Sequence, residues 1–428
     1  MTDLLEYADR AWRGEADAGF FRTGRLRKEG LHEIAEGVWM WPAFGNVYLF
    51  PTSAGLFCYD TGEKRTARDL LAATRVRTDA PLHTAVYSHG HLDHVSGVDP
   101  FDAEAAERGW RRPTVIAHEN TPRRFRRYAA TAGYNVAINE RQFQVPVRWP
   151  GQYRYPDLTY RDSTTVRVGE LDVLLRHDRG ETDDATIAWL PGRRILCCGD
   201  FFIWASPNAG NPQKVQRYAA EWARALRWMA GLGAGLLLPG HGMPIAGADR
   251  VRTALTDTAE FLQTLHDQTV EAMNAGATLD EVIHSVTAPA ELLAKPYLRP
   301  SYDEPEFVAR NVWRLYGGWY DGNPANLKPA RRENLSREIA ALSGGADRLA
   351  ARARELLAAG EHRLAAHFAQ FATDADPSSS DAHGARADVF SALEKAATST
   401  MAKGVYASAA AESRMVRNGD MPQKRDTP

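Results

Sequence analysis

Three histidines and one aspartate stand within six residues of the chain, in the order His-x-His-x-Asp-His over residues 89–94. Imidazole nitrogens and carboxylate oxygens are common protein ligands of divalent cations such as zinc. On extended chain, side chains two residues apart point to the same side, so His89 and His91 can hold one ion. Asp93 and His94 then point elsewhere and can hold a second ion. The motif therefore predicts a site for two cations rather than a histidine-rich surface loop that binds nothing.

The residues before this motif predict the strand that delivers it. Residues 84–87 read Thr-Ala-Val-Tyr, a β-type run that ends where the motif begins. A helix can start directly after the motif, at residues 95–98. Loops at the carboxyl ends of buried strands are recurrent active-site positions in α/β folds. We therefore expect an α/β protein with its chemistry at the end of a sheet.

The order of these ligands resembles that of the metallo-β-lactamase superfamily, and the resemblance covers about residues 36–250. It implies an α/β fold of the αββα sandwich type, with the remaining ligands following later strands. It also implies that Asp60, in an Asp-Thr-Gly turn, supports the metal site from beneath without binding metal. The alternative for Asp60 is a turn residue that caps the next helix.

Three later residues complete the ligand set that the resemblance implies. Glu181 follows a glycine at a position where the superfamily usually has a histidine. Asp200 ends a strand and would bridge both ions, and His241 follows an apolar strand and would complete the ligands of the second ion. The implied ligands are then His89, His91 and Glu181 for one ion, and Asp93, His94 and His241 for the other. His118 and His177 also follow or end strands. We expect His118 to be a neighbour of the site, and His177 either to support the ligands or to pack in the core.

Seven nitrogen and oxygen ligands without cysteine suit two zinc ions, with manganese or iron possible. Two such ions, typically about 3.5–4 Å apart, lower the pKa of a shared water and hold a hydroxide as nucleophile. Hydrolysis is the expected reaction, and Asp93 and Asp200 are the expected catalytic residues beside that hydroxide.

Two further features are similar to the alkylsulfatase branch of the superfamily. One is Glu181 itself, within the string Glu-Thr-Asp-Asp-Ala, and the other is the aromatic-rich stretch 302–324. This stretch resembles the opening of the alkylsulfatase dimerisation domain, and it implies a homodimer. Beyond it, the pattern predicts helices at 346–360, 361–373 and 382–397, which resemble a tetratricopeptide-like hairpin array.

Two departures from that branch bear on the substrate. Many alkylsulfatases carry a further C-terminal module that resembles a sterol carrier domain, and we expect this chain to lack it. Their bridging carboxylate is often glutamate, whereas Asp200 stands here. Both departures argue against a long-chain alkyl sulfate as the natural substrate.

The leading hypothesis is a dinuclear zinc hydrolase of a small anionic sulfate ester, with Asn208, Asn211 and Arg217 as candidate anion-binding residues. One alternative is hydrolysis of a phosphodiester, lactone or thioester on the same scaffold. Another is a non-catalytic dimeric binding protein, which the intact set of seven ligands argues against.

Composition and pattern complete these expectations. A net charge of −2 offers no electrostatic case for a nucleic-acid partner or an anionic membrane. No apolar run has the length of a signal peptide or a membrane span, and three cysteines make no disulfide framework, so we expect a cytoplasmic protein. The predicted domains are a helical lead-in at 1–35, a catalytic domain at 36–290, a helical dimerisation domain at 291–416 and a disordered tail at 417–428.

Overall fold

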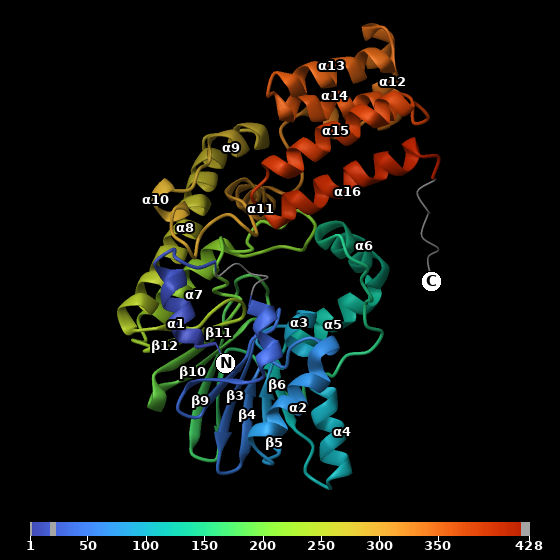
Figure 1. Cartoon of the computed structure of the whole chain (residues 1–428). Coiled ribbons are helices and arrows are strands. Elements are labelled where there is room, and N and C mark those ends of the chain that lie inside the picture. Colours follow the sequence, from blue (N-terminus) through green and yellow to red (C-terminus); the bar gives the residue numbers. More distant parts are fainter. Residues whose placement is uncertain (1, 18–22, 421–428) are drawn as a thin grey trace. The chain divides into compact units, whose positions relative to one another are not determined.

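The strands of the protein form two sheets that pack face to face (Figure 1). The structure is a computed structural model, and it describes residues 2–17 and 23–420. The chain divides into two compact units, each described here by itself. The first comprises Met1–Ala130 and Pro150–Trp319, and the second comprises Thr131–Trp149 and Tyr320–Pro428. This division does not test the predicted domain boundaries, which stay predictions. Most of the predicted tail, residues 421–428, lies outside the described residues.

The first sheet contains seven strands in chain order, antiparallel from β1 to β4 and parallel from β4 to β7. The strand predicted at residues 84–87 is β5. The strands are β1 (His32–Ala35), β2 (Val38–Trp41), β3 (Val47–Thr52), β4 (Gly55–Tyr59), β5 (Leu82–Val86), β6 (Thr114–His118) and β7 (Leu158–Tyr160).

The second sheet contains six strands in the order β13-β12-β11-β10-β9-β8, antiparallel except for the parallel pair β11 and β12. Its strands are β8 (Ser163–Val168), β9 (Leu171–His177), β10 (Thr186–Leu190), β11 (Ile195–Gly199), β12 (Leu236–Pro239) and β13 (Ile245–Ala246).

Strand β4 shows why its sheet is buried on both faces. Successive side chains of a strand point to opposite faces. Phe57 and Tyr59 join the core shared with the second sheet, whereas Leu56 and Cys58 join a separate core on the other face. That outer face is covered by α2 (Ala67–Arg77) and α4 (Asp99–Glu107), and the second sheet is covered by α7 (Ala219–Ala230) and α8 (Ala248–Asn274). Helices lie on both sides of the pair of sheets (Figure 1), so the predicted αββα sandwich is confirmed.

The N-terminal segment is only partly helical. Helix α1 (Leu4–Trp12) buries Leu4, Ala8 and Ala11 in the main core, and a short 3₁₀ segment follows at Thr23–Glu29. His32–Ala35 forms the edge strand β1, although the sequence predicts a helical lead-in through residue 35. His32 and Ile34 alternate with exposed or half-exposed neighbours, a two-residue period that suits a strand.

Short and long helices complete the first unit. Helix α3 (Leu92–Val95) lies within the histidine motif, and α11 (Pro305–Gly317) packs on α8 and α9. The others are α5 (Thr121–Ala130), α9 (Leu279–Ser285) and α10 (Ala290–Leu293).

The second unit is helical, as predicted for the C-terminal part of the chain. Small buried residues, among them Ala350, Ala372 and Ala385, let its helices approach closely. The helices are α6 (Ala132–Phe143), α12 (Arg332–Ser343), α13 (Ala346–Ala358), α14 (His362–Ala375), α15 (Ser380–Ala396) and α16 (Thr400–Arg417).

Helix α6 joins this unit from the middle of the sequence. It packs against α16, and Gln144 Nε2 donates a hydrogen bond to the carbonyl of Gly404 over 3.0 Å. A Cβ atom on Gly404 would lie 2.0 Å from the carbonyl oxygen of Gln142. The contact therefore requires a glycine at position 404.

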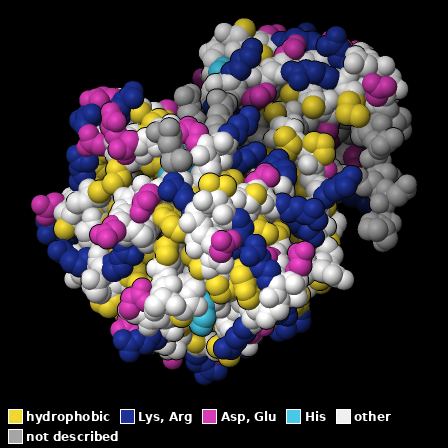
Figure 2. Space-filling model, turned by 60° about the horizontal axis from the view of Figure 1, so that its bottom comes forward, with side chains coloured by type: hydrophobic (Ala, Val, Ile, Leu, Met, Phe, Trp, Pro, Cys, Tyr) yellow, Lys and Arg dark blue, Asp and Glu magenta, His cyan; other side chains and the backbone are white. Residues whose placement is uncertain are grey.

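Basic and acidic side chains are interspersed on the face shown in Figure 2, in line with the net charge of −2. Within residues 2–17 and 23–420, we find no helix with both the length and the apolar character of a membrane span.

Replacing Gly404 with valine should destabilise the second unit by about 1–3 kcal/mol, because the added atoms overpack the contact with α6. Thermal unfolding and limited proteolysis of residues 131–149 would measure the effect. The matched control is Lys403→Val, which places the same residue at the exposed neighbouring position. Equal stability of the two variants would contradict the packing argument.

Candidate metal centre

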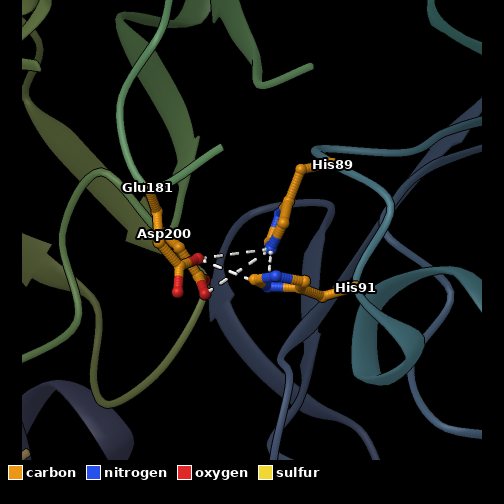
Figure 3. Close-up of side chains that lie close together, drawn as sticks. All are labelled: His89, His91, Glu181 and Asp200. Atoms are coloured by element: carbon orange, nitrogen blue, oxygen red, sulfur yellow. Dashed lines mark hydrogen bonds and ion pairs between the residues drawn. The ribbon is translucent and has the colours of Figure 1, made fainter. Parts of the chain in front are cut away.

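The seven predicted ligands lie at the ends of strands from both sheets. His89 and His91 follow β5, Asp93 and His94 lie in the short helix α3, and the other three follow β9, β11 and β12. Figure 3 shows His89 and His91 pointing from one side towards Glu181 and Asp200 on the other. Their donor atoms fall into two clusters, which we call the first ligand group (His89, His91, Glu181, Asp200) and the second ligand group (Asp93, His94, His241).

In the first ligand group, ring nitrogens face carboxylate oxygens across a small gap. Nε2 of His89 lies 2.7 Å from Nδ1 of His91, and Glu181 Oε2 lies 3.5 Å and 3.3 Å from these two atoms. Burial lowers the pKa of His89 well below its usual value. The ring is therefore neutral, the form in which its nitrogen lone pair can bind a cation.

Asp200 lies between the two groups. Its Oδ2 is 3.7 Å from Nε2 of His89 and 3.2 Å from Nε2 of His241, and its Oδ1 is 3.5 Å from Nε2 of His94. In the second ligand group, Asp93 Oδ2 lies 3.3 Å from His94 Nε2 and 3.5 Å from His241 Nε2. The placement of Asp200 suits the bridging position predicted for it.

The donors fit divalent cations. Oε2 of Glu181 and Oδ1 of Asp200 are buried, and neither accepts a hydrogen bond from the described residues. Burial raises the pKa of Asp200 above its usual value because it disfavours the charged carboxylate, although the rings of His241 and His94 oppose the rise. Imidazole nitrogens and carboxylate oxygens without thiolates suit zinc, manganese or iron.

Each of three imidazoles has one nitrogen held by the protein and the other directed into the site. His94 Nδ1 lies 2.8 Å from Asp60 Oδ2, and His89 Nδ1 lies 2.9 Å from Ser88 Oγ. His241 Nδ1 bonds the backbone carbonyl of Phe44. Such contacts orient metal-binding rings and select the nitrogen that faces the metal.

Asp60 has the supporting position expected of it. It is fully buried, its φ of +58° lies in the left-handed region, and its Oδ1 accepts the backbone N–H of Ser88 over 2.6 Å. One carboxylate therefore connects the end of β4 to the motif after β5 and to the ring of His94.

The sequence reasoning missed Asp184 and Arg124. Asp184 Oδ2 accepts the N–H of Gly90, inside the histidine motif, and the hydroxyl of Thr121, over 3.0 and 3.1 Å. Arg124 pairs with Asp184 over 2.8 Å, and both side chains are buried. In sequence, Arg124 lies in a stretch with several other arginines, and Asp184 lies in the string in which only Glu181 was singled out. Their pairing joins residues 60 positions apart, which no local pattern reveals.

Asn46 is another residue that the sequence did not single out. Its Nδ2 donates to the carbonyls of Pro239 and Gly242 over 3.1 and 2.9 Å, and its own N–H donates to the carbonyl of Gly240 over 2.8 Å. Asn46 therefore holds the turn that presents His241.

The three predicted anion-binding residues are all buried, and two of them, Asn208 and Arg217, contact Glu181 of the first ligand group. Asn208 Nδ2 donates to Glu181 Oε1, and Arg217 donates to the carbonyl of Glu181. Asn211 Oδ1 accepts the N–H of Gln213 over 3.0 Å, whereas its Nδ2 has no hydrogen-bond partner among the described residues.

Lys214, which the sequence reasoning missed, interacts electrostatically with Glu181, Asp93 and Arg217. Burial and Arg217 lower its pKa to about 8. A lysine in a polar loop is normally solvated, so its sequence context did not indicate this position.

His118 and His177 stack on each other, with ring centroids 3.5 Å apart and an interplanar angle of 11°. Neither belongs to a ligand group, as expected.

Two family models match the chain. The model described as the metallo-β-lactamase superfamily matches residues 40–241, and the one described as alkyl sulfatase dimerisation matches residues 278–415. The resemblance seen in the sequence is thereby confirmed.

Curated relatives are alkylsulfatases. A linear primary-alkylsulfatase of Pseudomonas sp. (strain ATCC 19151) is 27% identical over 390 residues, which cover 86% of this chain and 74% of the relative. An (R)-specific secondary-alkylsulfatase of Pseudomonas sp. is 28% identical over 407 residues, which cover 86% of this chain and 60% of the relative. This chain thus spans less than two thirds of the second relative.

The solved structure of the stereoselective inverting sec-alkylsulfatase Pisa1 from Pseudomonas sp. has the same fold. Its TM-score is 0.82 at 24% identity, with 96% of this chain and 70% of that chain covered.

Replacing Arg124 with glutamine should destabilise the protein by about 3–5 kcal/mol, because Asp184 keeps a buried charge without its partner. Urea denaturation of the protein would measure the loss. Arg123→Gln is the matched control, since Arg123 is exposed and adjacent in sequence. If both variants unfold at the same urea concentration, the pair does not have the structural role assigned to it.

Proposed function

Because the chain carries a metallo-β-lactamase superfamily domain followed by an alkylsulfatase dimerisation domain, we propose that it is a dinuclear zinc hydrolase of sulfate esters. The observation that carries this proposal is the pair of ligand groups that meet at Asp200, together with Glu181 in the first group. The names of the curated relatives point to an alkyl sulfate-like substrate.

The chain would hold two zinc ions through its two ligand groups. Bound in this way, two divalent ions lower the pKa of water and neutralise charge that develops during ester hydrolysis. Asp200 would contribute to both ions, because its two oxygens face both groups. Asp93, the carboxylate of the second ligand group, is the other one that we assign to catalysis.

Buried donors in the loop that follows Asp200 would bind the anionic part of the substrate. Nε of Arg217 and Nδ2 of Asn211 are buried and donate no hydrogen bond to the described residues. Lys214 adds a positive charge near them. Buried donors that lack partners carry a desolvation cost, which the oxygens of a bound sulfate group would offset. Asn208 donates to Glu181, so we assign it chiefly to holding that carboxylate.

Zinc-loaded protein should release sulfate from short, long or secondary alkyl sulfates, and His91→Ala should reduce the rate by about 100-fold or more, because it removes a ligand. His118→Ala is the control, since His118 is a buried histidine outside both ligand groups. Phosphodiesters, lactones and thioesters complete the substrate panel. If the protein binds two zinc ions but releases no sulfate, the assignment as a metallohydrolase stands and the sulfate ester is ruled out as its substrate.

We also propose a cytoplasmic homodimer. The dimerisation model covers most of the second unit, and Leu342 of α12 is 91% exposed within one chain. The cysteines are all buried and unpaired, which suits a reducing compartment.

Sedimentation should give twice the mass of the chain, and Leu342→Asp should shift the protein towards the monomer, because a charge would be placed in the contact. Val76→Asp is the control, since Val76 is 85% exposed but lies on α2 of the first unit. A monomeric wild-type protein would contradict this assignment.

A further inference from the structure

The loop between β11 and α7 carries Asn208 and Arg217, which contact Glu181, but it contains no helix or strand among its described residues. Such a loop needs partners elsewhere to hold its side chains in place. These partners come from residues 299–314, a segment of the first unit that ends in α11.

Asp303 is the central contact of this segment. It is fully buried, its Oδ2 accepts the N–H of Gly210 over 2.6 Å, and its Oδ1 accepts the N–H of Glu304 over 2.8 Å. Its backbone carbonyl accepts the hydroxyl of Ser206 over 2.6 Å. Asp303 therefore holds the loop on both sides of Asn208.

Helix α11 holds the other end of the loop. Asn311 Nδ2 donates to the carbonyl of Arg217 over 3.0 Å, and Gln216 Nε2 donates to the carbonyl of Asn311 over 2.9 Å. Arg314 Nε donates to Gln216 Oε1 over 3.0 Å. The backbone position of Arg217 is thus set by a helix almost one hundred residues away in sequence.

The backbone of the loop at Gly210 is too close to the backbone of α11 for any side chain to fit between them. A Cβ atom on Gly210 would lie 2.1 Å from the carbonyl carbon of Phe307 and 2.2 Å from the nitrogen of Val308. The first turn of α11 therefore lies directly on the loop backbone, two residues from Asn208.

Two side chains of the loop, held in this way, bind Glu181. Asn208 donates to Glu181 Oε1, and Arg217 donates to the Glu181 carbonyl with its guanidinium 3.5 Å from Oε1. One carboxylate oxygen is therefore held by the loop, and Oε2 is left to face the two rings of the first ligand group.

We infer that Asp303 and Asn311 are positioning residues of the candidate metal centre, which act through Asn208 and Arg217 on the Glu181 carboxylate. The inference rests on the metal centre of the proposed function but not on the identity of the ester. It gives a role at the site to residues inside the stretch that matches the dimerisation model.

The burial of Asp303 supports this role. Burial raises the pKa of its carboxyl group to about 7, although the N–H groups of Gly210 and Glu304 oppose the rise. Burying a carboxyl group is costly, and the two N–H groups that its oxygens accept offset part of this cost. Loss of residues that orient metal ligands typically costs about 10–100-fold in metal affinity.

The test measures zinc affinity of the full-length protein by chelator competition, with thermal unfolding followed in parallel. Asp303→Asn should weaken the binding of one of the two zinc ions by about 10-fold. The amide has only one oxygen, so its NH₂ group would face the backbone N–H of either Gly210 or Glu304. Asn311→Ala should act in the same direction. Arg310→Gln is the matched control, since Arg310 lies on the exposed side of α11 and pairs with Glu306.

A double-mutant cycle separates positioning from general loss of structure. Asn208→Ala should weaken zinc by itself, and Asp303→Asn should add little in that background, because both act through one carboxylate. The inference would be overturned if the losses of zinc affinity in the two single variants simply add in the double variant. It would also be overturned if Asp303→Asn lowers the melting temperature but leaves the zinc affinity unchanged. Wild-type protein that binds no zinc would overturn the metal centre and this inference together. Zinc binding without sulfate release, by contrast, would discard only the sulfate ester.

Discussion

At the ends of strands from both sheets, each of three carboxylates lies within ion-pair distance of at least two of four imidazoles. In an interior of low dielectric constant, carboxylates repel one another and each unpaired oxygen carries a desolvation cost. Asp200 illustrates both effects, because burial and the nearby Glu181 carboxylate raise its pKa, and its Oδ1 accepts no hydrogen bond from the described residues. A bound cation would offset these costs, and its binding free energy would add to folding stability. The first unit is built around this requirement.

Distant parts of the chain supply the contacts that keep the ligands in place. Asp60, at the end of β4, holds the ring of His94, and Asn46, before β3, holds the turn that presents His241. The contact made by Asn46 runs from the first sheet to the second. Asp184 provides a further connection between the sheets through the backbone of Gly90. The site therefore depends on how the two sheets pack, and it also contributes polar contacts between them.

The segments of the two units alternate along the sequence. Helix α11 lies within the matched dimerisation model, yet it belongs to the first unit and packs on the loop beside Glu181. Residues 131–149 come from the middle of the matched superfamily region, yet they belong to the second unit through α6. Helix α11 buries Val308, Ala309 and Val312 in the main core of the first unit. Helix α6 packs against α16, more than 250 residues away in sequence. Sequence position alone therefore does not assign these two segments to a unit.

The sequence by itself determined the candidate ligands and the strands that carry them. The spacing of His89, His91, Asp93 and His94 is local. The resemblance to the metallo-β-lactamase superfamily pointed to the three later ligands, each of which follows a β-type run. Only the tertiary structure decided that Asp184 pairs with Arg124, that Lys214 interacts with Glu181 and Asp93, and that Asp303 holds the loop beside the site. In sequence, these residues resemble ordinary surface or turn residues. Their partners lie tens of residues away or more, and the partner of a buried polar group depends on packing that no short-range periodicity encodes.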